Sequence, residues 1–392
     1  MAYICDCNRY NCKILINRAL NDLIRHYLPD KRTLVILGPR RVGKTTLLRS
    51  VQNENKNVLF LNGDEKEIQT LFESGNVETL KKAFGSNEIV ILDEAQRITN
   101  IGLSLKLITD DLPQIKLIVS GSSAFHLNNS IQEMLTGRKW DFKMYPLSYS
   151  EMVGHHGWIK EKLLLSHRMV YGYYPDVVLN DGLERKILRE LLQEYLYKDI
   201  LLRQDIKKSD KLYDLLRALA YQVGHEVNYT QLGKLIHLDN ETIEKYIVLL
   251  EQCFIIFRLN AYSRNLRNEI KRGKKIYFFD NGVRNALISN FQQLELRNDI
   301  GALWENFIVS ERMKKLEYTE TYPNNYFWRT TDQAEIDYLE DMDGILSCYE
   351  FKWNPSKGKS IPASFIKAYP QSNYTIIHRE NFEDFIGLKV DA

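Results

Sequence analysis

The first third of the chain alternates short apolar runs with amphipathic stretches of helical period. Four of these runs are continuous and rich in Val, Ile and Leu: residues 33–37, 57–61, 88–92 and 116–120. Runs of this length are typical of strands buried on both faces of a parallel sheet, and the stretches between them are long enough for crossover helices. The pattern predicts an α/β fold with a parallel sheet over residues 1–145.

From residue 146 to residue 205 a helical period replaces the apolar runs. Residues 171–175 read YGYYP and mark a turn, and residues 183–202 form one long amphipathic helix or two abutting helices. We expect an all-helical extension of the α/β unit, which we call the helical lid.

Two short helices joined by a tight turn are expected within residues 206–280. Apolar residues recur at spacings of four and three along 243–250, which places them on one helical face. Thr230 and Asp239 are suitable N-caps for the two helices. Two strands are expected behind them, at residues 254–259 and 275–279. This arrangement predicts a helix-turn-helix with two wing strands, a winged-helix domain.

Residues 281–392 show a third pattern, with the predicted order αβββαβ. The helices are expected at residues 300–316 and 364–368, and the strands at residues 325–329, 334–340, 345–353 and 374–378. This order predicts a second α/β domain.

The composition limits the class of protein. At 392 residues the chain is too long for one ordinary core, which predicts several domains. Its apolar fraction of 44% and charged fraction of 27% are those of a soluble globular protein, and the net charge of +2 identifies no partner. Without a long apolar run or a signal-peptide pattern, we expect a cytoplasmic protein with no membrane partner.

Five cysteines favour a reducing compartment over a disulfide framework, because two of them, Cys253 and Cys348, lie in apolar stretches. Cys5, Cys7 and Cys12 lie close together but lack a fourth ligand at a spacing typical of zinc sites. We expect no metal there.

Residues 38–45 read GPRRVGKT and lie between a predicted strand and a predicted helix. Glycines let this backbone curl so that its N–H groups face phosphate oxygens at a helix N-terminus. Lys44 would reach the β- and γ-phosphates of ATP, and Thr45 would place its hydroxyl on Mg²⁺. The predicted nucleotide-binding residues are Gly38, Pro39, Arg40, Arg41, Val42, Gly43, Lys44, Thr45 and Thr46. With these flanking elements, a chance match in a turn is the weaker interpretation.

An acidic pair, Asp93-Glu94, ends the third apolar run. Asp93 can hold Mg²⁺ through water, and Glu94 is positioned to act as the general base that polarises the attacking water. An ordinary helix cap is the alternative, but a position one crossover beyond the phosphate loop favours the metal role. The adjacent glutamate indicates hydrolysis in addition to binding.

Two further residues are candidates for catalysis. Ser122, in the Ser-Gly-Ser-Ser segment after the fourth run, can contact the γ-phosphate or the attacking water, although such a segment is also a common turn. Arg138 can stabilise charge in the transition state, although a lone arginine is more often a solvated surface charge.

These motifs resemble a large prokaryotic family of AAA/STAND-type P-loop ATPases that carry a C-terminal domain of unknown function. The matching segments are GPRRVGKTTLL, ILDEAQ, VSGSSAF, LTGR with PLSYSE, YGYYPDVV and YLYKDIL, and they span most of the chain. The second of two glycines usual in YGYYPDVV is replaced by Tyr173. The resemblance implies ATP binding, slow hydrolysis, a winged helix and a nuclease-like C-terminal fold, without a defined biological role.

The C-terminal strands carry a candidate Mg²⁺ site that resembles the restriction-endonuclease-like core. Glu350 and Lys352 share a strand face because they are two residues apart, and Asp337 on a neighbouring strand can meet them. Glu305 on the preceding helix would add a fourth group. Carboxylates suit Mg²⁺, which polarises phosphate. Cross-strand ion pairs are the alternative reading of the same residues.

A basic stretch runs from Arg258 in the first predicted wing strand to Lys275 in the second. Seven basic residues face one acid, Glu269, and the candidate DNA contacts among them are Arg264, Arg267, Lys271, Arg272, Lys274 and Lys275. The alternatives are a solvated loop and a winged helix that docks a protein.

Three functions remain open at this level. The first is an ATP-driven machine on double-stranded DNA, and the second is a STAND-like switch that controls a protein partner without acting on nucleic acid. The third is a Mg²⁺-dependent nuclease gated by ATP. ATP and Mg²⁺ are the expected cofactors in all three, and the oligomeric state stays undefined.

Overall fold

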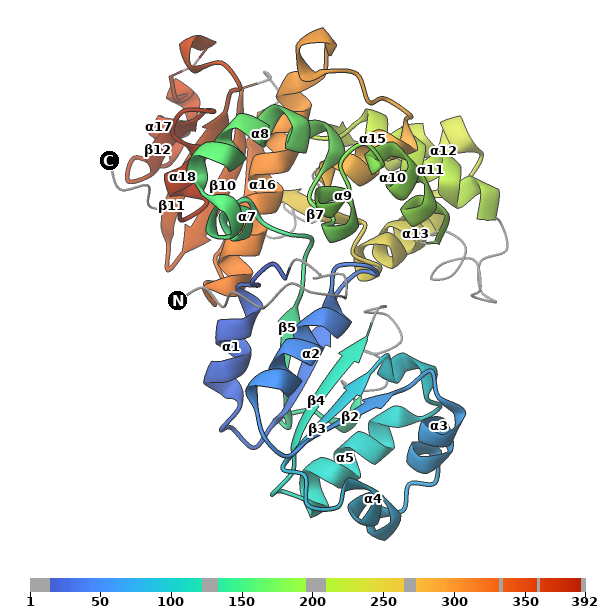
Figure 1. Cartoon of the computed structure of the whole chain (residues 1–392). Helices are drawn as coiled ribbons and strands as arrows, with labels where there is room; N and C mark the ends of the chain where they lie inside the picture. Colours follow the sequence, from blue (N-terminus) through green and yellow to red (C-terminus); the bar gives the residue numbers. More distant parts are fainter. Residues whose placement is uncertain are drawn as a thin grey trace.

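The computed structural model describes residues 15–121, 133–194, 209–263, 273–330, 334–357 and 360–388. Figure 1 shows two bodies: strands β1–β5 with helices α1–α5 form the lower one, drawn blue to cyan, and the chain from α7 onward forms the other. The predicted cysteine cluster Cys5, Cys7 and Cys12 lies outside the described residues.

The lower body contains a five-stranded parallel sheet in the order β2-β3-β4-β1-β5. Its strands are β1 (Thr33–Leu37), β2 (Val58–Asn62), β3 (Ile89–Asp93), β4 (Lys116–Gly121) and β5 (Lys139–Lys143). Its helices are α1 (Leu20–Tyr27), α2 (Lys44–Glu54), α3 (Lys66–Glu73), α4 (Val77–Phe84) and α5 (Ile101–Asp111). The prediction of an α/β fold with a parallel sheet is confirmed.

Both faces of this sheet are covered, which explains the continuous apolar runs. Leu34 and Ile36 of β1 belong to the apolar cluster that contains the inner faces of α1 and α2. Val35 and Leu37 belong to the cluster that contains those of α3, α4 and α5. Because successive strand residues point to opposite faces, a strand covered on both sides needs apolar residues at every position.

Strand β5 was not predicted from the sequence. Its residues read KWDFK, and only Phe142 among them is buried. As an edge strand that pairs with β1 alone, β5 keeps polar residues and lacks the apolar run that identified the other four strands.

The helical lid contains α7 (Tyr149–His156), α8 (Trp158–Tyr171), α9 (Pro175–Leu179) and α10 (Glu184–Glu194). Ser148 and Glu151 form a reciprocal capping box at the start of α7, which fixes where that helix begins. The turn before α9 requires glycine, since Gly172 has φ of 76° and a Cβ would lie 2.1 Å from Asp280 Oδ1. Tyr173, which replaces the family's second glycine, is buried, and its hydroxyl donates to Glu161.

The next elements follow the predicted helix-turn-helix order: α11 (Ser209–Tyr221), β6 (Glu226–Val227), α12 (Tyr229–Ile236), α13 (Asn240–Gln252), β7 (Ile256–Ala261) and β8 (Lys274–Phe278). Asp239 caps α13 by accepting the Thr242 N–H at 2.8 Å. The prediction of Thr230 as a cap is wrong, because Asn228 accepts the Gln231 N–H and α12 begins one residue before Thr230.

The remaining elements are α15 (Asn281–Leu287), α16 (Ile300–Tyr318), β9 (Asn324–Arg329), β10 (Glu335–Met342), β11 (Ile345–Phe351), α17 (Ala363–Ala368), β12 (Asn373–Ile377) and α18 (Phe382–Phe385). From α16 to β12 they follow the predicted order αβββαβ. They join the preceding strands in one seven-stranded sheet of order β12-β11-β10-β9-β7-β8-β6. The expected boundary between residues 280 and 281 therefore does not separate two sheets, because β7 pairs with β9 in parallel.

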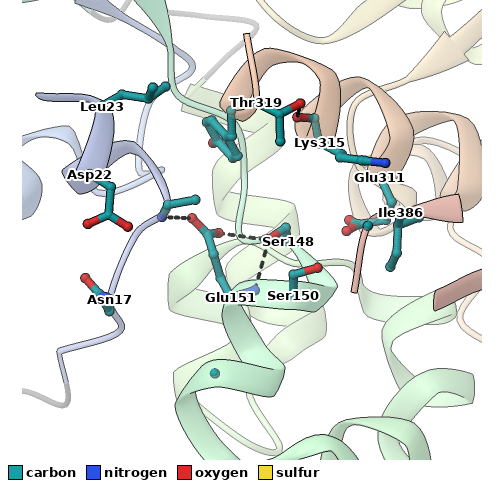
Figure 2. A pocket seen from close by; sticks show the side chains of 14 residues that line it. Asn17, Asp22, Leu23, Ser148, Ser150, Glu151, Glu311, Lys315, Thr319 and Ile386 are labelled. Atoms are coloured by element: carbon teal, nitrogen blue, oxygen red, sulfur yellow. Dashed lines mark hydrogen bonds between the residues drawn. The ribbon is translucent and has the colours of Figure 1, made fainter. Parts of the chain in front are cut away.

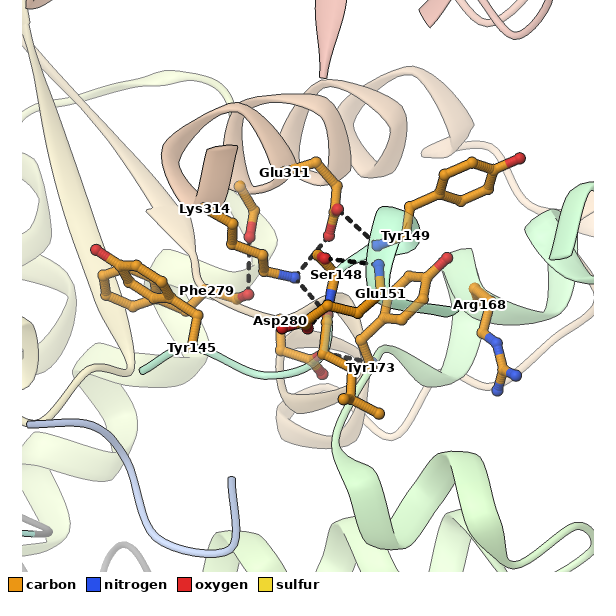
Figure 3. A network of polar contacts seen from close by, with 12 residues as sticks. Tyr145, Ser148, Tyr149, Glu151, Arg168, Tyr173, Phe279, Asp280, Glu311 and Lys314 are labelled. Carbon is orange, nitrogen blue, oxygen red and sulfur yellow. Dashed lines mark hydrogen bonds and ion pairs between the residues drawn. The ribbon is translucent and has the colours of Figure 1, made fainter. Parts of the chain in front are cut away.

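A buried polar network connects the segment after β5 to the second body (Figure 3). Lys314 of α16 donates to the Leu147 carbonyl at 2.9 Å and to Glu311 Oε1 at 2.6 Å. Glu311 in turn accepts the Tyr149 N–H at 2.8 Å, at the start of α7. On the lid side, Asp280 accepts the Tyr173 N–H at 2.6 Å. Buried polar groups that are all paired hold one arrangement of the surrounding elements.

Candidate functional site

The predicted phosphate loop lies between β1 and α2 in the conformation that its glycines permit. Gly43 has φ of 96°, and Arg41 also adopts a positive φ, of 58°. A Cβ on Gly38 would lie 2.2 Å from the Met144 carbonyl oxygen, so a side chain has no space there. The loop ends at the N-terminus of α2, where free backbone N–H groups suit a phosphate.

Lys44 is buried, and its ammonium group donates to the carbonyls of Gly38 at 2.9 Å and Pro39 at 2.8 Å. The ammonium is therefore hydrogen-bonded to backbone carbonyls of the phosphate loop itself. A phosphate in the loop would offer a charged acceptor in place of these neutral carbonyls.

Thr45 and Asp93 meet at the carboxyl end of the sheet. The Thr45 hydroxyl donates to Asp93 Oδ2 at 2.6 Å, and Asp93 is only 3% exposed. Ser120, at the end of β4 and fully buried, donates to the other oxygen, Asp93 Oδ1. A phosphate-loop hydroxyl beside a strand-end carboxylate is the donor set that Mg²⁺ takes in P-loop NTPases, so the residues fit this ion.

Glu94 follows Asp93 in a left-handed backbone conformation with φ of 54°. Its N–H donates to Ser120 Oγ at 3.2 Å, and Gln96 Nε2 donates to Glu94 Oε2. The Glu94 side chain thus has a defined orientation, and the residue lines the same cavity as Lys44 and Thr45. The sequence analysis placed Ser120 in the candidate Ser-Gly-Ser-Ser segment but chose Ser122 from it, and it did not identify Gln96.

The cavity beside the phosphate loop has a volume of about 730 Å³. One wall is the loop and the start of α2, and the opposite wall comes from the helical lid and from the segment before α1. The lining residues outside the loop and α2 are Leu15, Ile16, Arg18, Asn21, Glu94, Leu147, Pro175, Asp176, Leu179 and Asn180. A polar phosphate end and a wall with apolar side chains are the features of a cofactor pocket.

Two arginines link the loop to other elements. Arg18, which is 6% exposed, donates to the Val42 carbonyl and pairs with Glu151 of α7 at 3.0 Å. Arg41 reaches the lid, where Glu194 Oε1 lies 2.6 Å from its Nη2 and Asp176 Oδ2 lies 3.8 Å from its Nη1. These contacts join residues far apart in the sequence.

A second cavity, of about 500 Å³, lies where α1, α7 and α16 meet (Figure 2). Glu151 in its wall accepts N–H groups of Ala19 and Ser148 and pairs with Arg18. Its buried carboxylate is therefore engaged by the chain itself.

Of the two predicted auxiliary catalytic residues, only Arg138 lies within the described residues. Arg138 directly precedes β5, whose first residue, Lys139, pairs with Thr33 at the start of β1. It therefore lies at the end of the sheet opposite the loop, where Asp110 pairs with it, so its predicted role at this loop is wrong. Ser122 lies outside the described residues.

The predicted C-terminal residues lie together. Lys352 Nζ is 2.6 Å from Glu350 Oε1 and 3.8 Å from Asp337 Oδ2, and Asp337 also accepts the Phe351 N–H. Lys275 of β8 joins them, with Nζ 3.1 Å from Glu305 Oε1 and 2.6 Å from Glu335 Oε1. We call Glu305, Glu335, Asp337 and Glu350 the carboxylate cluster.

Lys275 is 1% exposed, so its predicted role as a DNA contact is wrong. Burial alone would lower the pKa of Lys275, but the attraction of Glu305, Asp337 and Glu335 outweighs burial and raises it. Lys274 pairs with Glu244 at 3.2 Å, which leaves it only partly available to a phosphate. The other candidate DNA contacts, Arg264, Arg267, Lys271 and Arg272, lie outside the described residues.

No helix in the described part of the chain is long and apolar enough to cross a membrane. The described residues also contain no group of three or more His, Cys, Asp or Glu side chains that could hold a metal ion. Cys253 and Cys348 are both buried, as expected from their apolar surroundings.

Comparison with known protein families divides the chain in three. Residues 30–153 match the AAA domain family. Residues 162–294 and 300–387 each match a domain of unknown function, DUF8612 and DUF4143. The first match and the parallel sheet together identify a P-loop ATPase-type AAA domain.

Relatives along most of the chain are themselves uncharacterized proteins. One from Haemophilus influenzae is 27% identical over 78% of this chain and 78% of its own length. One from Methanocaldococcus jannaschii is 25% identical over 96% of this chain and 88% of its own length. Among solved structures, a Walker-type ATPase of Pyrococcus abyssi aligns with a TM-score of 0.50 and 18% identity, covering 70% of this chain and 96% of that one. This last likeness concerns the fold alone.

Proposed function

We propose that this chain binds ATP with Mg²⁺ at the phosphate loop, hydrolyses it slowly, and uses the nucleotide state to set how the helical lid contacts the loop. The observation that carries the proposal is the hydrogen-bonded set Thr45, Asp93 and Ser120, with Glu94 beside it in the same cavity as Lys44. These contacts hold both carboxylate oxygens of the buried Asp93 beside the phosphate loop, where a metal ion could use them.

Each residue has a distinct task in the proposed reaction. The loop N–H groups and Lys44 bind the phosphates and offset the charge of the transition state. Thr45 and Asp93 would hold Mg²⁺, which when bound would neutralise phosphate charge. Glu94 orients the attacking water and accepts its proton. Gln96 keeps one Glu94 oxygen fixed, which leaves the other for that water.

Coupling to the lid follows from Arg41. Its guanidinium belongs to the loop that would bind the phosphates, yet it pairs with Asp176 and Glu194 of the lid. Phosphate charge near the loop competes with these carboxylates for the same cation. Binding and loss of the terminal phosphate would then change the strength of the contact between loop and lid.

As the target of this coupling we favour a protein partner over DNA. Lys275 is buried and Lys274 is paired, so two of the six predicted DNA contacts are engaged within the chain. A switch that acts on a protein needs no basic surface. DNA binding would rest on Arg264, Arg267, Lys271 and Arg272, and a salt-dependent affinity of the intact chain for duplex DNA would favour it instead.

The binding step is tested with Lys44→Ala. Loss of charge-assisted hydrogen bonds to phosphate costs about 1.5–3 kcal/mol, so ATP affinity should fall about 10- to 100-fold. Calorimetric titration with ATP and Mg²⁺ measures this fall, and Lys66→Ala, an exposed lysine on α3, is the matched control. Equal affinities of the parent and Lys44→Ala would contradict the assignment of the loop.

A further inference from the structure

The carboxylate cluster gathers four acidic side chains from three elements. Glu305 comes from α16, Glu335 and Asp337 from β10, and Glu350 from β11. The resemblance to a restriction-endonuclease-like core implies that such side chains hold Mg²⁺. Within the described residues they do not form a group arranged to hold a metal ion. The observed geometry therefore does not fit the Mg²⁺ ion that the resemblance implies. The reason is Lys275 of β8.

Lys275 reaches the cluster from a part of the chain outside the αβββαβ unit. It belongs to residues 162–294, which match one domain family, whereas the four carboxylates belong to residues 300–387, which match another. Its Nζ lies 2.6 Å from Glu335 Oε1 and 3.1 Å from Glu305 Oε1. The hydroxyl of Tyr277, two residues along the same strand, donates to that same Glu305 oxygen at 2.7 Å.

The Lys275 side chain is enclosed by the surrounding elements. Lys275 is 1% exposed, and its backbone pairs with Leu259 of β7 on one side and Glu226 of β6 on the other. Mg²⁺ binds carboxylate oxygens at about 2.0–2.1 Å, closer than the ammonium does. A metal bound by Glu305 and Glu335 would need the space that the Lys275 ammonium fills.

We propose that the Lys275 ammonium is the counter-ion of the carboxylate cluster and occupies the place of a metal, so that the cluster does not bind Mg²⁺. The ion pairs of Lys275 then stabilise the contact between β8 and the C-terminal αβββαβ unit. A buried ammonium with two carboxylate partners is held firmly, because removing it leaves the partly buried carboxylates of Glu305 and Glu335 without this counter-ion. The seven-stranded sheet, in which β7 and β9 join the two family segments, is thereby reinforced through its side chains. This inference goes beyond the proposed ATPase and does not depend on it.

The test compares variants of the intact chain without nucleotide, so that the phosphate loop contributes no tight metal site. Lys275→Met keeps the length of the side chain and removes its charge. Lys352→Met is the matched control, because Lys352 pairs with Glu350 in the same cluster but its side chain is 25% exposed. Thermal unfolding is recorded with and without Mg²⁺, and Mn²⁺ binding is recorded by electron paramagnetic resonance.

We expect Lys275→Met to lower the unfolding temperature by about 5–15 °C, more than Lys352→Met does, and millimolar Mg²⁺ to recover part of this loss. The parent should show no change in unfolding temperature with Mg²⁺. Equal effects of the two substitutions would overturn the proposal.

If Lys275→Met does not fold, the parent and Asp337→Asn still decide the question. The proposal predicts the same Mn²⁺ binding for both, because the cluster takes no metal in either. A Mn²⁺ site of the parent that is lost in Asp337→Asn would refute it.

Discussion

At the scale of single residues, Ser120 gives the acidic pair its geometry. It donates to Asp93 Oδ1 and accepts the Glu94 N–H, so one buried hydroxyl orients both acids. Glu94 needs this support because its backbone has φ of 54°, a conformation that few residues other than glycine adopt without strain. The polar groups around Asp93 are thus ordered before any nucleotide arrives.

Ser120→Ala should lower the rate of ATP turnover about 10- to 100-fold, as is usual when a residue that orients a metal ligand is removed. The affinity for ATP without Mg²⁺ should change little, because Ser120 does not touch the loop. Steady-state turnover and ATP titration measure the two effects. Ser104→Ala is the control, since Ser104 is a buried serine whose hydroxyl bonds only the Phe72 carbonyl in the same body. Equal turnover of the two variants would contradict the positioning role.

The loop residues and the acidic pair could be predicted because a short spacing carries their chemistry. Ser120 and Arg18 could not, since each acts through contacts with residues more than 20 positions away. Lys275 was misread for a related reason. Its charge and its place in a basic stretch suggested a surface, whereas the sheet buries it against carboxylates of another segment.

At the scale of elements, α9 and α10 are the parts of the lid closest to the phosphate loop. Pro175, Asp176 and Leu179 of α9 line the cavity, and Glu194 at the end of α10 pairs with Arg41. Because α9 lines the cavity and Glu194 pairs with Arg41 of the loop, we expect the amides of both helices to respond to what the cavity holds.

Arg41→Ala should uncouple these helices from the nucleotide. In the parent, ATP with Mg²⁺ should change the hydrogen exchange of the α9 and α10 amides, because phosphate charge competes with Asp176 and Glu194 for Arg41. In Arg41→Ala this difference should fall by at least half, while ATP still binds through Lys44. Arg189→Ala, an exposed arginine on α10, is the control. An unchanged exchange difference in Arg41→Ala would assign the coupling to other contacts.

Prediction of elements worked where an apolar period is strong. The four apolar strands β1–β4 of the first sheet and the αβββαβ order appear within a few residues of their predicted positions. It failed for β5, an edge strand with one buried residue, and for the start of α12, where Asn228 and Thr230 are both acceptable caps. For α12, the N-cap preferences of the residues could not distinguish between Asn228 and Thr230.

At the scale of the whole molecule, the two bodies meet through a buried polar network and through aromatic packing. Tyr145, just after β5, stacks on Phe279 with ring centroids 5.3 Å apart. Lys314 and Glu311 of α16 bind the backbone of the segment that leads from the ATPase-type domain into the lid. The lid and α16 are therefore connected through paired, buried groups.

Lys314→Met should destabilise this junction by about 3–5 kcal/mol, because it leaves the Glu311 carboxylate buried without its cation. Urea unfolding followed by tryptophan fluorescence measures the loss. Lys315→Met is the control, since Lys315 is the next residue and lines the cavity of Figure 2 without bridging the network. A junction that owes its stability to apolar packing alone would show equal effects for both lysines.

The joining of the two C-terminal units in one sheet could not be predicted from the sequence. Residues 254–259 and 325–329 each show a strand pattern, but nothing in either pattern indicates that β7 and β9 pair, because pairing partners leave no periodic signal. Domain boundaries drawn from changes of pattern were therefore placed inside a continuous sheet.

The measurement that tests the account most directly is single-turnover ATP hydrolysis by the intact parent and by Glu94→Gln, with Mg²⁺ and with ATP affinity measured on the same samples. Glutamine keeps the size of the side chain and its contact with Gln96 but cannot accept a proton. We predict ATP affinity within about threefold of the parent and a hydrolysis rate lower by about 10²- to 10⁴-fold, the usual contribution of a general base. Equal rates at equal affinity would contradict the assignment of Glu94 and, with it, the proposed ATPase site.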